Sequence, residues 1–442
     1  MVCHTGDKLY SWGRYPAHPQ TAKPCHWRAD IQQNLADLAS RYGTLLPFGN
    51  GRSYGDSCLA ASDQVLCMRS LDRFIEADWR TGLIRAEAGV TLQEVLKLAI
   101  PKGWFLPVTP GTQFVTLGGA LANDVHGKNH HVRGTFGCHV PRFGLIRSDQ
   151  PPLNCSSQEN AELYAATIGG LGLTGIIDWV ELQLTPIRSS LIDATHIRFG
   201  NLNEFFALSA ELDSKFEFTV SWIDCLARGK SVGRGIYMAG NHAEEGPLEF
   251  AKPSKLNVRV TPPISAINRL SLQLFNSAYY QGHRAGRHDS RIDYEPFFYP
   301  LDRILNWNRI YGPKGFQQYQ CAIPDANAAV ATRELLDAIA AAHSGSFLAV
   351  LKRFGNITSP GLLSFPLPGA TLALDFPQQG ELTARLFARL DAIVREAGGR
   401  IYPAKDAHMN GEDFKNAYPV FEKIRSLSDP VISSRFWQRV AT

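Results

Sequence analysis

The stretch PGTQFVTLGGALANDVHGKNHH at residues 110–131 is one of three glycine-bearing segments in the first half of the chain. The other two read PFGNGRSYGD at residues 47–56 and TIGGLGLTG at residues 167–175. Runs of Gly, Ser and Thr let the backbone approach a pyrophosphate without clashes from Cβ atoms, and they turn several N–H groups toward it. The three segments together therefore predict a flavin site that holds the diphosphate of FAD.

Residues 170–175, GLGLTG, also match the dinucleotide-binding pattern G-x-G-x-x-G letter for letter. That pattern has to follow a strand and open a helix. Here the next residues, 176–184, read IIDWVELQL, in which Val180, Leu182 and Leu184 alternate as they do in a half-buried strand. The glycines therefore lead into a strand, and a Rossmann-type nucleotide site is not expected.

The composition is that of an ordinary globular protein. The 442 residues are 44% hydrophobic and 19% charged, which is enough apolar material for two or three domains. The formal net charge of +4 comes without a run of like charges, so nucleic acid is not an expected partner. Eight cysteines are scattered without C-x-x-C or metal-ligand spacing, which predicts reduced thiols and no metal site.

The chain has no apolar run of about 18 residues, and it does not start with the basic and apolar regions of a signal peptide. These two observations lead us to expect a cytoplasmic protein.

The local sequence patterns predict different secondary structure before and after Pro186. A helix begins at Thr91, where TLQE forms a capping box, and ends near Pro101, because proline cannot continue it. Beyond Pro186, helical patterns alternate with short apolar strands, which predicts an α+β unit with helices on one face of an antiparallel sheet. The predicted helices are residues 203–212, 325–343 and 381–397, and the predicted strands are residues 216–224, 317–323, 347–352 and 372–376.

Two adjoining segments leave alternatives open. Residues 281–294, QGHRAGRHDSRIDY, are almost free of aliphatic side chains, which is typical of a solvated mobile loop or of a lid that contacts an anionic or lipid head group. Residues 264–280 have apolar side chains near helical spacing. Such a helix either packs on its domain or lies on a membrane surface.

Short motifs in a fixed order over nearly the whole chain carry a family resemblance. They include WGR at residues 12–14, VTPGT at 108–112, DVHGKNHH at 124–131, LDFP at 374–377 and GGRIYPAKD at 398–406. With the glycine segments, they resemble the vanillyl-alcohol oxidase and p-cresol methylhydroxylase (PCMH) superfamily and, within it, the decaprenylphosphoryl-ribose oxidase family. The resemblance implies a two-domain α+β fold with a PCMH-type FAD-binding domain at residues 1–185, a substrate domain on an antiparallel sheet at residues 186–399, and a return to the FAD domain at residues 400–442.

The same resemblance implies an FAD-dependent oxidoreductase that oxidises a secondary sugar hydroxyl, namely the 2′-OH of a polyprenylphosphoryl-ribose, to a keto sugar. This step would be the oxidase half of an epimerisation to arabinose for the cell wall, completed by a separate keto-sugar reductase. A lipid-linked substrate would also bring the protein to the inner face of the membrane as a peripheral protein.

Two other functions stay open. One is an aldonolactone or alditol oxidase that acts on free sugars. IYPAKD at residues 401–406 counts against it, since those enzymes usually end in a His-Trp-Gly-Lys type motif. The other is a flavin-binding scaffold protein with little turnover, against which the set of Lys405, His126 and Lys128 argues.

The resemblance also assigns the catalytic and substrate-binding residues. Lys405 matches the lysine that contacts substrate, and it either takes the hydroxyl proton as a base whose pKa burial has lowered, or stays charged and binds substrate or Asp406. His126 and Lys128 match residues beside the isoalloxazine ring and in the pocket. The implied substrate-binding residues are Tyr54, Tyr299, Gln318, Gln320 and Lys352.

FAD is expected to bind without a covalent bond, because residues 51–54 contain no His or Cys that could attach to the flavin. Three departures from the family pattern leave the substrate open, namely Thr371 and Ala373 in place of Asn and Cys, and Ala227 in place of Ser. The implied cofactor-binding residues are Gly49, Asn50, Gly51, Arg52, Ser53, Tyr54, Pro110, Gly111, Thr112, Thr116, Gly118, Gly119, Asn123, His126, Gly170, Gly172, Gly175, Ile177 and Tyr402.

Overall fold

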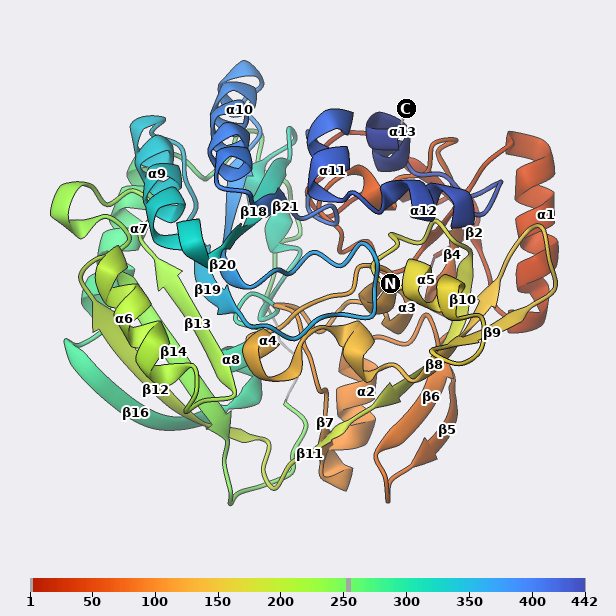
Figure 1. Ribbon diagram of the computed structural model, residues 1–442, viewed down its shortest axis with the longest axis horizontal. Coiled ribbons are helices and arrows are strands. Elements are labelled where there is room, and N and C mark those ends of the chain that lie inside the picture. Colours follow the sequence, from red (N-terminus) through yellow and green to blue (C-terminus); the bar gives the residue numbers. More distant parts are fainter. Residues whose placement is uncertain (1–2, 252–255, 442) are drawn as a thin grey trace.

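A computed structural model describes residues 3–251 and 256–441. One side of the molecule is built on an eight-stranded sheet, and two smaller sheets lie on the other side (Figure 1). The large sheet has the order β16 (Gly286–Asp293), β12 (Leu191–Phe199), β14 (Gly235–His242), β13 (Phe218–Ile223), β19 (Ala349–Phe354), β20 (Gly369–Pro377), β18 (Phe316–Pro324) and β21 (Arg400–Ile401).

The two smaller sheets carry the N-terminal part of the chain. The five-stranded antiparallel sheet has the order β5 (Phe74–Asp78), β6 (Leu83–Glu87), β10 (Ile176–Gln183), β8 (Arg142–Ile146) and β9 (Leu153–Ser156). The four-stranded sheet has the order β1 (Lys8–Leu9), β2 (Gln20–Pro24), β4 (Gln64–Cys67) and β3 (Leu46–Phe48). The helices of this part are α1 (Ile31–Tyr42), α2 (Leu92–Ala99), α3 (Leu117–Ala122), α4 (His130–Arg133) and α5 (Ala161–Thr167).

The predicted elements after Pro186 are confirmed. The helices α6 (Leu202–Leu212), α9 (Ala328–Ala341) and α10 (Glu381–Glu396) lie on one face of the large sheet (Figure 1). Apolar side chains of these helices, such as Leu335 and Leu390, are buried in one core with Leu372 of the sheet. This arrangement is the α+β architecture that the alternating patterns predicted.

The two local predictions in the N-terminal part are also confirmed. Thr91 caps α2 with a complete capping box, in which Thr91 Oγ1 accepts from the Glu94 backbone N–H and Glu94 Oε2 accepts from the Thr91 N–H. The GLGLTG segment leads into β10, a strand buried over nearly its whole length. A strand after the glycines removes the helix that a Rossmann-type site requires.

The expectation of an irregular loop at residues 281–294 is wrong. Most of that segment forms the edge strand β16, which pairs with β12 in antiparallel register. All but one of its residues are exposed, so both faces of the strand are polar and no apolar alternation marks it in the sequence. The helix predicted before it is present as α7 (Arg269–Gly282).

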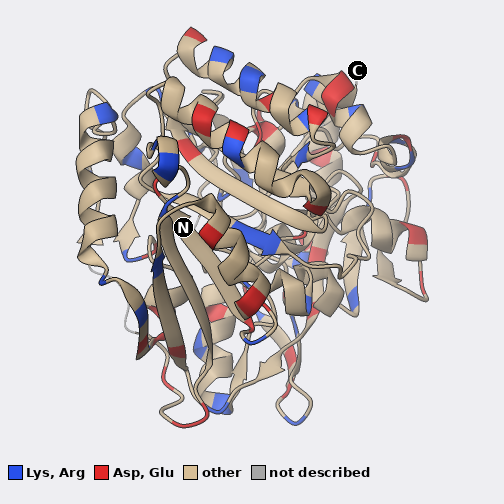
Figure 2. Ribbon diagram, turned by 60° about the vertical axis from the view of Figure 1, so that its left-hand side comes forward, with Lys and Arg blue, Asp and Glu red and all other residues tan. Residues whose placement is uncertain are grey.

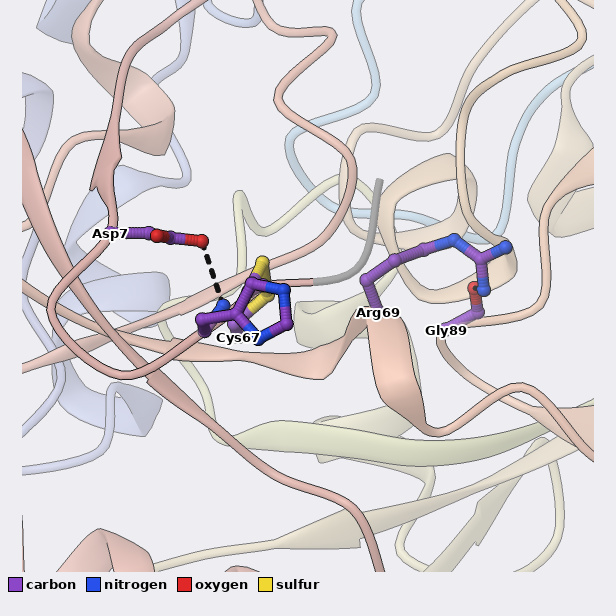
Figure 3. Close-up of a disulfide and its surroundings, with 6 residues drawn as sticks. Asp7, Cys67, Arg69 and Gly89 are labelled. Atoms are coloured by element: carbon purple, nitrogen blue, oxygen red, sulfur yellow. Dashed lines mark hydrogen bonds between the residues drawn. A yellow bond between two sulfur atoms is a disulfide. The ribbon is translucent and has the colours of Figure 1, made fainter.

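The expectation that all thiols are reduced is also wrong, because Cys3 and Cys67 form a disulfide (Figure 3). The bond joins residues 64 positions apart, which become neighbours because β1 and β4 lie in the same sheet, on either side of β2. Cysteine spacing cannot reveal such a pair, since it depends on tertiary structure. Disulfides persist mainly in oxidising compartments, so this bond does not support the expected cytoplasmic location.

The last part of the chain crosses from the large sheet to the N-terminal side of the molecule. After β21 it forms α11 (Gly411–Ala417), α12 (Phe421–Leu427) and α13 (Arg435–Ala441), which lie beside the N-terminal segments (Figure 1). Arg439 of α13 forms an ion pair with Asp56. Among the residues that the structure describes, no helix is long and apolar enough to cross a membrane.

Candidate active site

A cavity of about 510 Å³ opens between the glycine segments and the face of the large sheet that faces away from α9 and α10. Three strands supply most of its floor through alternating residues, because side chains two apart on a strand point to the same face, and Val220 of β13 adds to it. The alternating residues are Gln318 and Gln320 on β18, Val350 and Lys352 on β19, and Thr371 and Ala373 on β20. The opposite wall comes from residues 46–54 and from residues within 109–128.

The glycine-rich wall of the cavity suits an anionic group such as the FAD diphosphate. Arg52 lies in this wall, where burial lowers its pKa to about 10, and its guanidinium lies 4.3 Å from the Trp12 ring centroid. Its Nε atom is buried without a partner in the protein. An unpaired N–H of a buried cation is costly unless an acceptor binds to it. At Gly55, a Cβ atom would lie 1.6 Å from the Asp406 carbonyl oxygen, so only glycine allows this loop to approach Asp406.

Three buried lysines, which we call the lysine cluster, share this cavity: Lys128, Lys352 and Lys405. Lys128 donates to the Phe297 carbonyl at 2.7 Å, and Lys352 donates to the Gly127 carbonyl at 2.7 Å. Burial lowers the pKa of Lys128 to about 7. Burial, and then the charges of the other two lysines, lower the pKa of Lys352 to about 7.

Lys405 is the member of the lysine cluster that lies against the Tyr54 ring. Its Nζ lies 3.8 Å from the centroid of the Tyr54 ring, and burial lowers its pKa to about 8. The neighbouring Asp406 does not neutralise it, because that carboxylate pairs with Arg439 at 2.9 Å and with His408 at 2.9 Å. The alternative in which Lys405 pairs with Asp406 is therefore contradicted.

Asp375 is the acidic group that acts on Lys405, and sequence reasoning did not single it out. It lies on β20 opposite Gln318, whose Nε2 donates to Asp375 Oδ1 at 2.6 Å. Burial raises the pKa of Asp375 to about 7, against the opposing effects of Gln318 and Lys405. Its negative charge is the opposing influence that raises the pKa of Lys405.

His126 is neutral and has one free N–H. Burial lowers its pKa well below the usual value, and the charges of Lys352 and Lys405 add to this effect. The Gln320 amide nitrogen lies 3.0 Å from His126 Nε2, so Nε2 accepts and the proton lies on Nδ1. Nδ1 is buried without a partner in the protein, which leaves a donor for a bound molecule.

Comparison with known proteins adds an independent line of argument. Residues 25–149 match the FAD binding domain family. The chain is 33% identical over 96% of its length, and over 95% of the relative, to decaprenylphosphoryl-beta-D-ribose oxidase of Mycolicibacterium smegmatis. The chain belongs to the decaprenylphosphoryl-beta-D-ribose oxidase family.

This membership makes the chain an FAD-dependent oxidoreductase with a PCMH-type FAD-binding fold. More distant similarity extends to other flavin enzymes. The chain is 25% identical to L-gulonolactone oxidase of Mus musculus over 41% of both chains. It is also 25% identical to delta(24)-sterol reductase of Homo sapiens, over 43% of this chain and 35% of the relative.

The structure brings nearly all the residues predicted for the site into one place. Every predicted catalytic, substrate-binding and cofactor-binding residue lines the cavity except Tyr299 and Gly170. Tyr299 is fully buried behind the wall, where its hydroxyl contacts Thr109 Oγ1 at 2.5 Å. A Cβ atom on Gly170 would lie 2.0 Å from the Ala166 carbonyl oxygen, so this glycine allows the chain to turn after α5.

Several cavity residues of this oxidoreductase were missed. Asp302, Trp307 and Trp12 line the cavity, and burial raises the pKa of Asp302 to about 7. The Asp302 carboxylate accepts from the Gln113 backbone N–H at 2.8 Å. The sequence shows WGR at residues 12–14 and YPLDRILNW at residues 299–307, but nothing in their spacing indicates that they meet at a cavity. Thr371 and Ala373, which depart from the family pattern, lie on its floor.

Within the described residues, 3–251 and 256–441, no group of three His, Cys, Asp or Glu side chains is arranged to hold a metal ion.

Proposed function

We propose that this oxidoreductase oxidises a secondary hydroxyl of a lipid-linked pentose, namely the 2′-OH of a polyprenylphosphoryl-ribose, to the keto sugar. The observation that carries the proposal is Lys405, a buried lysine whose pKa lies near 8, in the cavity that holds the FAD-binding wall. Support for the substrate class comes from the decaprenylphosphoryl-ribose oxidase relative.

In the proposed reaction, bound FAD supplies the hydride acceptor, and the residues of this chain position the sugar and hold its proton. The neutral amine of Lys405 takes the hydroxyl proton as the C–H bond breaks. Gln318 lies on the floor of the cavity, and in this proposal its amide contacts a sugar hydroxyl. Lys128 and Lys352 line the same cavity, and their amino groups suit hydrogen bonds to the phosphate of the substrate.

The keto sugar would then need a separate reductase to complete an epimerisation, and that reductase is the protein partner that we propose. Nucleic acid plays no part in this reaction.

The membrane side of the proposal rests on an exposed apolar surface beside the cavity. On α7, Leu270 and Leu274 are 66% and 64% exposed. In the segment before it, Val260 and Ile264 are 75% and 79% exposed. That segment runs along cavity-lining residues, because the Val258 N–H donates to the Leu305 carbonyl at 2.9 Å.

We propose that this apolar surface (Val260, Ile264, Leu270 and Leu274) lies on a bilayer that contains anionic lipid. Large exposed apolar side chains in a row are typical of interaction sites, and a lipid-linked substrate has to be taken from a membrane. α7 has no charged residue after Arg269, as its tan ribbon shows (Figure 2). Arg259 and Arg269, both exposed, supply positive charge at the same surface.

Vesicle flotation tests the membrane contact. The double variant Leu270→Glu, Leu274→Glu should bind anionic vesicles at least about tenfold more weakly, because two apolar anchors are replaced by charges. The double variant Gln273→Glu, Gln281→Glu is the matched control, since it adds the same charge to exposed positions of α7. Equal binding by both variants would contradict the membrane contact.

Anaerobic stopped-flow absorbance tests the reaction. Flavin bleaching with a short-chain polyprenylphosphoryl-ribose, and none with free alditols or aldonolactones, is the expected result. Bleaching with the free sugars would favour the alternative activity, which the similarity to L-gulonolactone oxidase supports. Absence of bleaching with every sugar would favour a flavin-binding scaffold.

A further inference from the structure

A second cavity, of about 230 Å³, lies at the edge of the large sheet, away from the active site. It is formed where the end of α7 meets β12 and β16. Its lining includes His196 and Arg198 of β12, His283 and Arg284 after α7, and His288 of β16. We call it the histidine–arginine pocket.

No carboxylate lines this pocket, so its arginines are not neutralised there. On β16, Asp289 points to the opposite face of the strand, where it accepts from Thr195 at 2.6 Å and pairs with Arg287 at 3.0 Å. Behind the pocket, Asp224 pairs with Arg234 at 2.7 Å. Asp289 and Asp224 therefore interact with residues that do not line the pocket.

The pocket arginines are positioned to bind a further acceptor. Arg198 donates from one nitrogen, Nη1, to the His283 carbonyl at 2.9 Å, and its guanidinium lies 5.3 Å from the Tyr280 ring centroid. This leaves other N–H groups of a planar guanidinium for an oxyanion. Arg284 is exposed beside it, at the rim.

The histidines make anion binding dependent on protonation. His283 Nδ1 lies 2.9 Å from the Tyr279 carbonyl, and His288 Nε2 lies 3.1 Å from the Ala285 carbonyl. Each ring therefore donates to the backbone, and its other nitrogen accepts unless the ring is protonated. Only the protonated rings can donate to an anion from these nitrogens.

The positive groups of the pocket repel one another, and a bound anion relieves this repulsion. Burial lowers the pKa of His196, and the charges of His283, Lys128 and His288 lower it further. A bound anion opposes these charges and favours protonation of the rings.

The pocket and the active site lie on the same face of the sheet. Val220, which lines the active-site cavity, pairs with Met238, and Met238 pairs with His196. Two strand spacings separate Val220 from His196, which is about 10 Å. A ligand in the pocket could therefore be a separate anion, or part of a molecule that reaches the active site.

We propose that the histidine–arginine pocket binds a phosphate group, supplied either by free phosphate or by a lipid-linked phosphate. Two arginines and histidines that become donors match the tetrahedral oxygens of phosphate. The proposal does not depend on the proposed oxidation.

NMR titration of the FAD-loaded protein with inorganic phosphate tests the proposal through the histidine ring signals. Saturable shifts of the pocket histidines are expected. Arg198→Gln should weaken phosphate binding about tenfold, because a charge-assisted hydrogen bond is lost. Arg284→Gln is a second variant at an exposed position, and it should weaken binding without an effect on folding.

Arg287→Gln is the matched control, because this arginine lies on the same strand but pairs with Asp289 on the other face. No saturable shift in the wild-type protein, or equal binding by Arg198→Gln, Arg284→Gln and the control, would overturn the proposal.

Farnesyl phosphate and farnesol, each in detergent, distinguish the two sources. Competition of farnesyl phosphate, but not farnesol, with inorganic phosphate assigns the pocket to lipid-linked phosphate. Binding of inorganic phosphate without such competition assigns it to a free anion.

Discussion

The acidic partner of Lys405 gives the sharpest test of the proposed base. Replacing Asp375 with Asn removes the negative charge that raises the pKa of Lys405 and keeps an oxygen to accept from Gln318. A nearby opposite charge shifts a pKa by roughly one unit or more, which is about 1.4 kcal/mol of stabilisation of the ammonium.

The sign of the effect follows from the role of the amine. A lysine acts as a base only when neutral, so the rate of flavin reduction rises with pH and levels off above about 8 in the wild-type protein. In Asp375→Asn, the pKa of Lys405 falls and the plateau begins about one pH unit lower. At pH 7 the neutral fraction rises from about one-tenth toward one-half, so reduction becomes up to about fivefold faster.

Anaerobic stopped-flow measurement of flavin reduction between pH 5.5 and 9 is the assay. Asp302→Asn is the control, because Asp302 is another buried acid whose pKa lies near 7, but its charge acts on Arg52 and not on Lys405. An unchanged pH profile in Asp375→Asn, with FAD bound normally, would refute Lys405 as the titrating base.

Other expectations follow from single sites. Lys405→Met should slow flavin reduction by about 10²–10⁴-fold in stopped-flow assays, with FAD absorbance unchanged. Gly55→Ala should lower the free energy of unfolding by about 1–3 kcal/mol in a denaturant titration, because the new Cβ meets the Asp406 carbonyl. Thr91→Ala should cost about 1 kcal/mol in the same titration, since it removes the cap of α2. Acid precipitation should release all the flavin into the supernatant, as expected for FAD held without a covalent bond.

Local sequence patterns were enough to predict the helices and strands that have one apolar face and one polar face. α10 has an apolar stripe that its sequence spacing shows, and the capping box at Thr91 fixes where α2 begins. β16 lacks such a signal, because a strand at the edge of a sheet can be polar on both faces. Its pairing with β12 depends on register, which only the folded chain defines.

The active site was predictable where a motif carried it and not where strand register carried it. Residues 125–128 of DVHGKNHH and residues 51–54 of GRSYGD line the cavity, because backbone shape at glycines is a local property. Asp375 acts on Lys405 because β20 pairs with β18 in one register that sets it opposite Gln318. A shift of one residue would turn Asp375 to the other face of the sheet.

The C-terminal segment pairs Asp406 with groups other than the neighbouring Lys405. The Asp406 carboxylate accepts from the Met409 backbone N–H at 3.0 Å and pairs with Arg439, which reaches it from α13. These contacts neutralise the negative charge of Asp406, and they hold its loop against the N-terminal side of the molecule. Lys405 then extends toward Tyr54 with Asp375 as the acid that acts on it. Burial without a neutralising neighbour favours the neutral amine, so the ion pairs of Asp406 support the proposed role of Lys405 as a base.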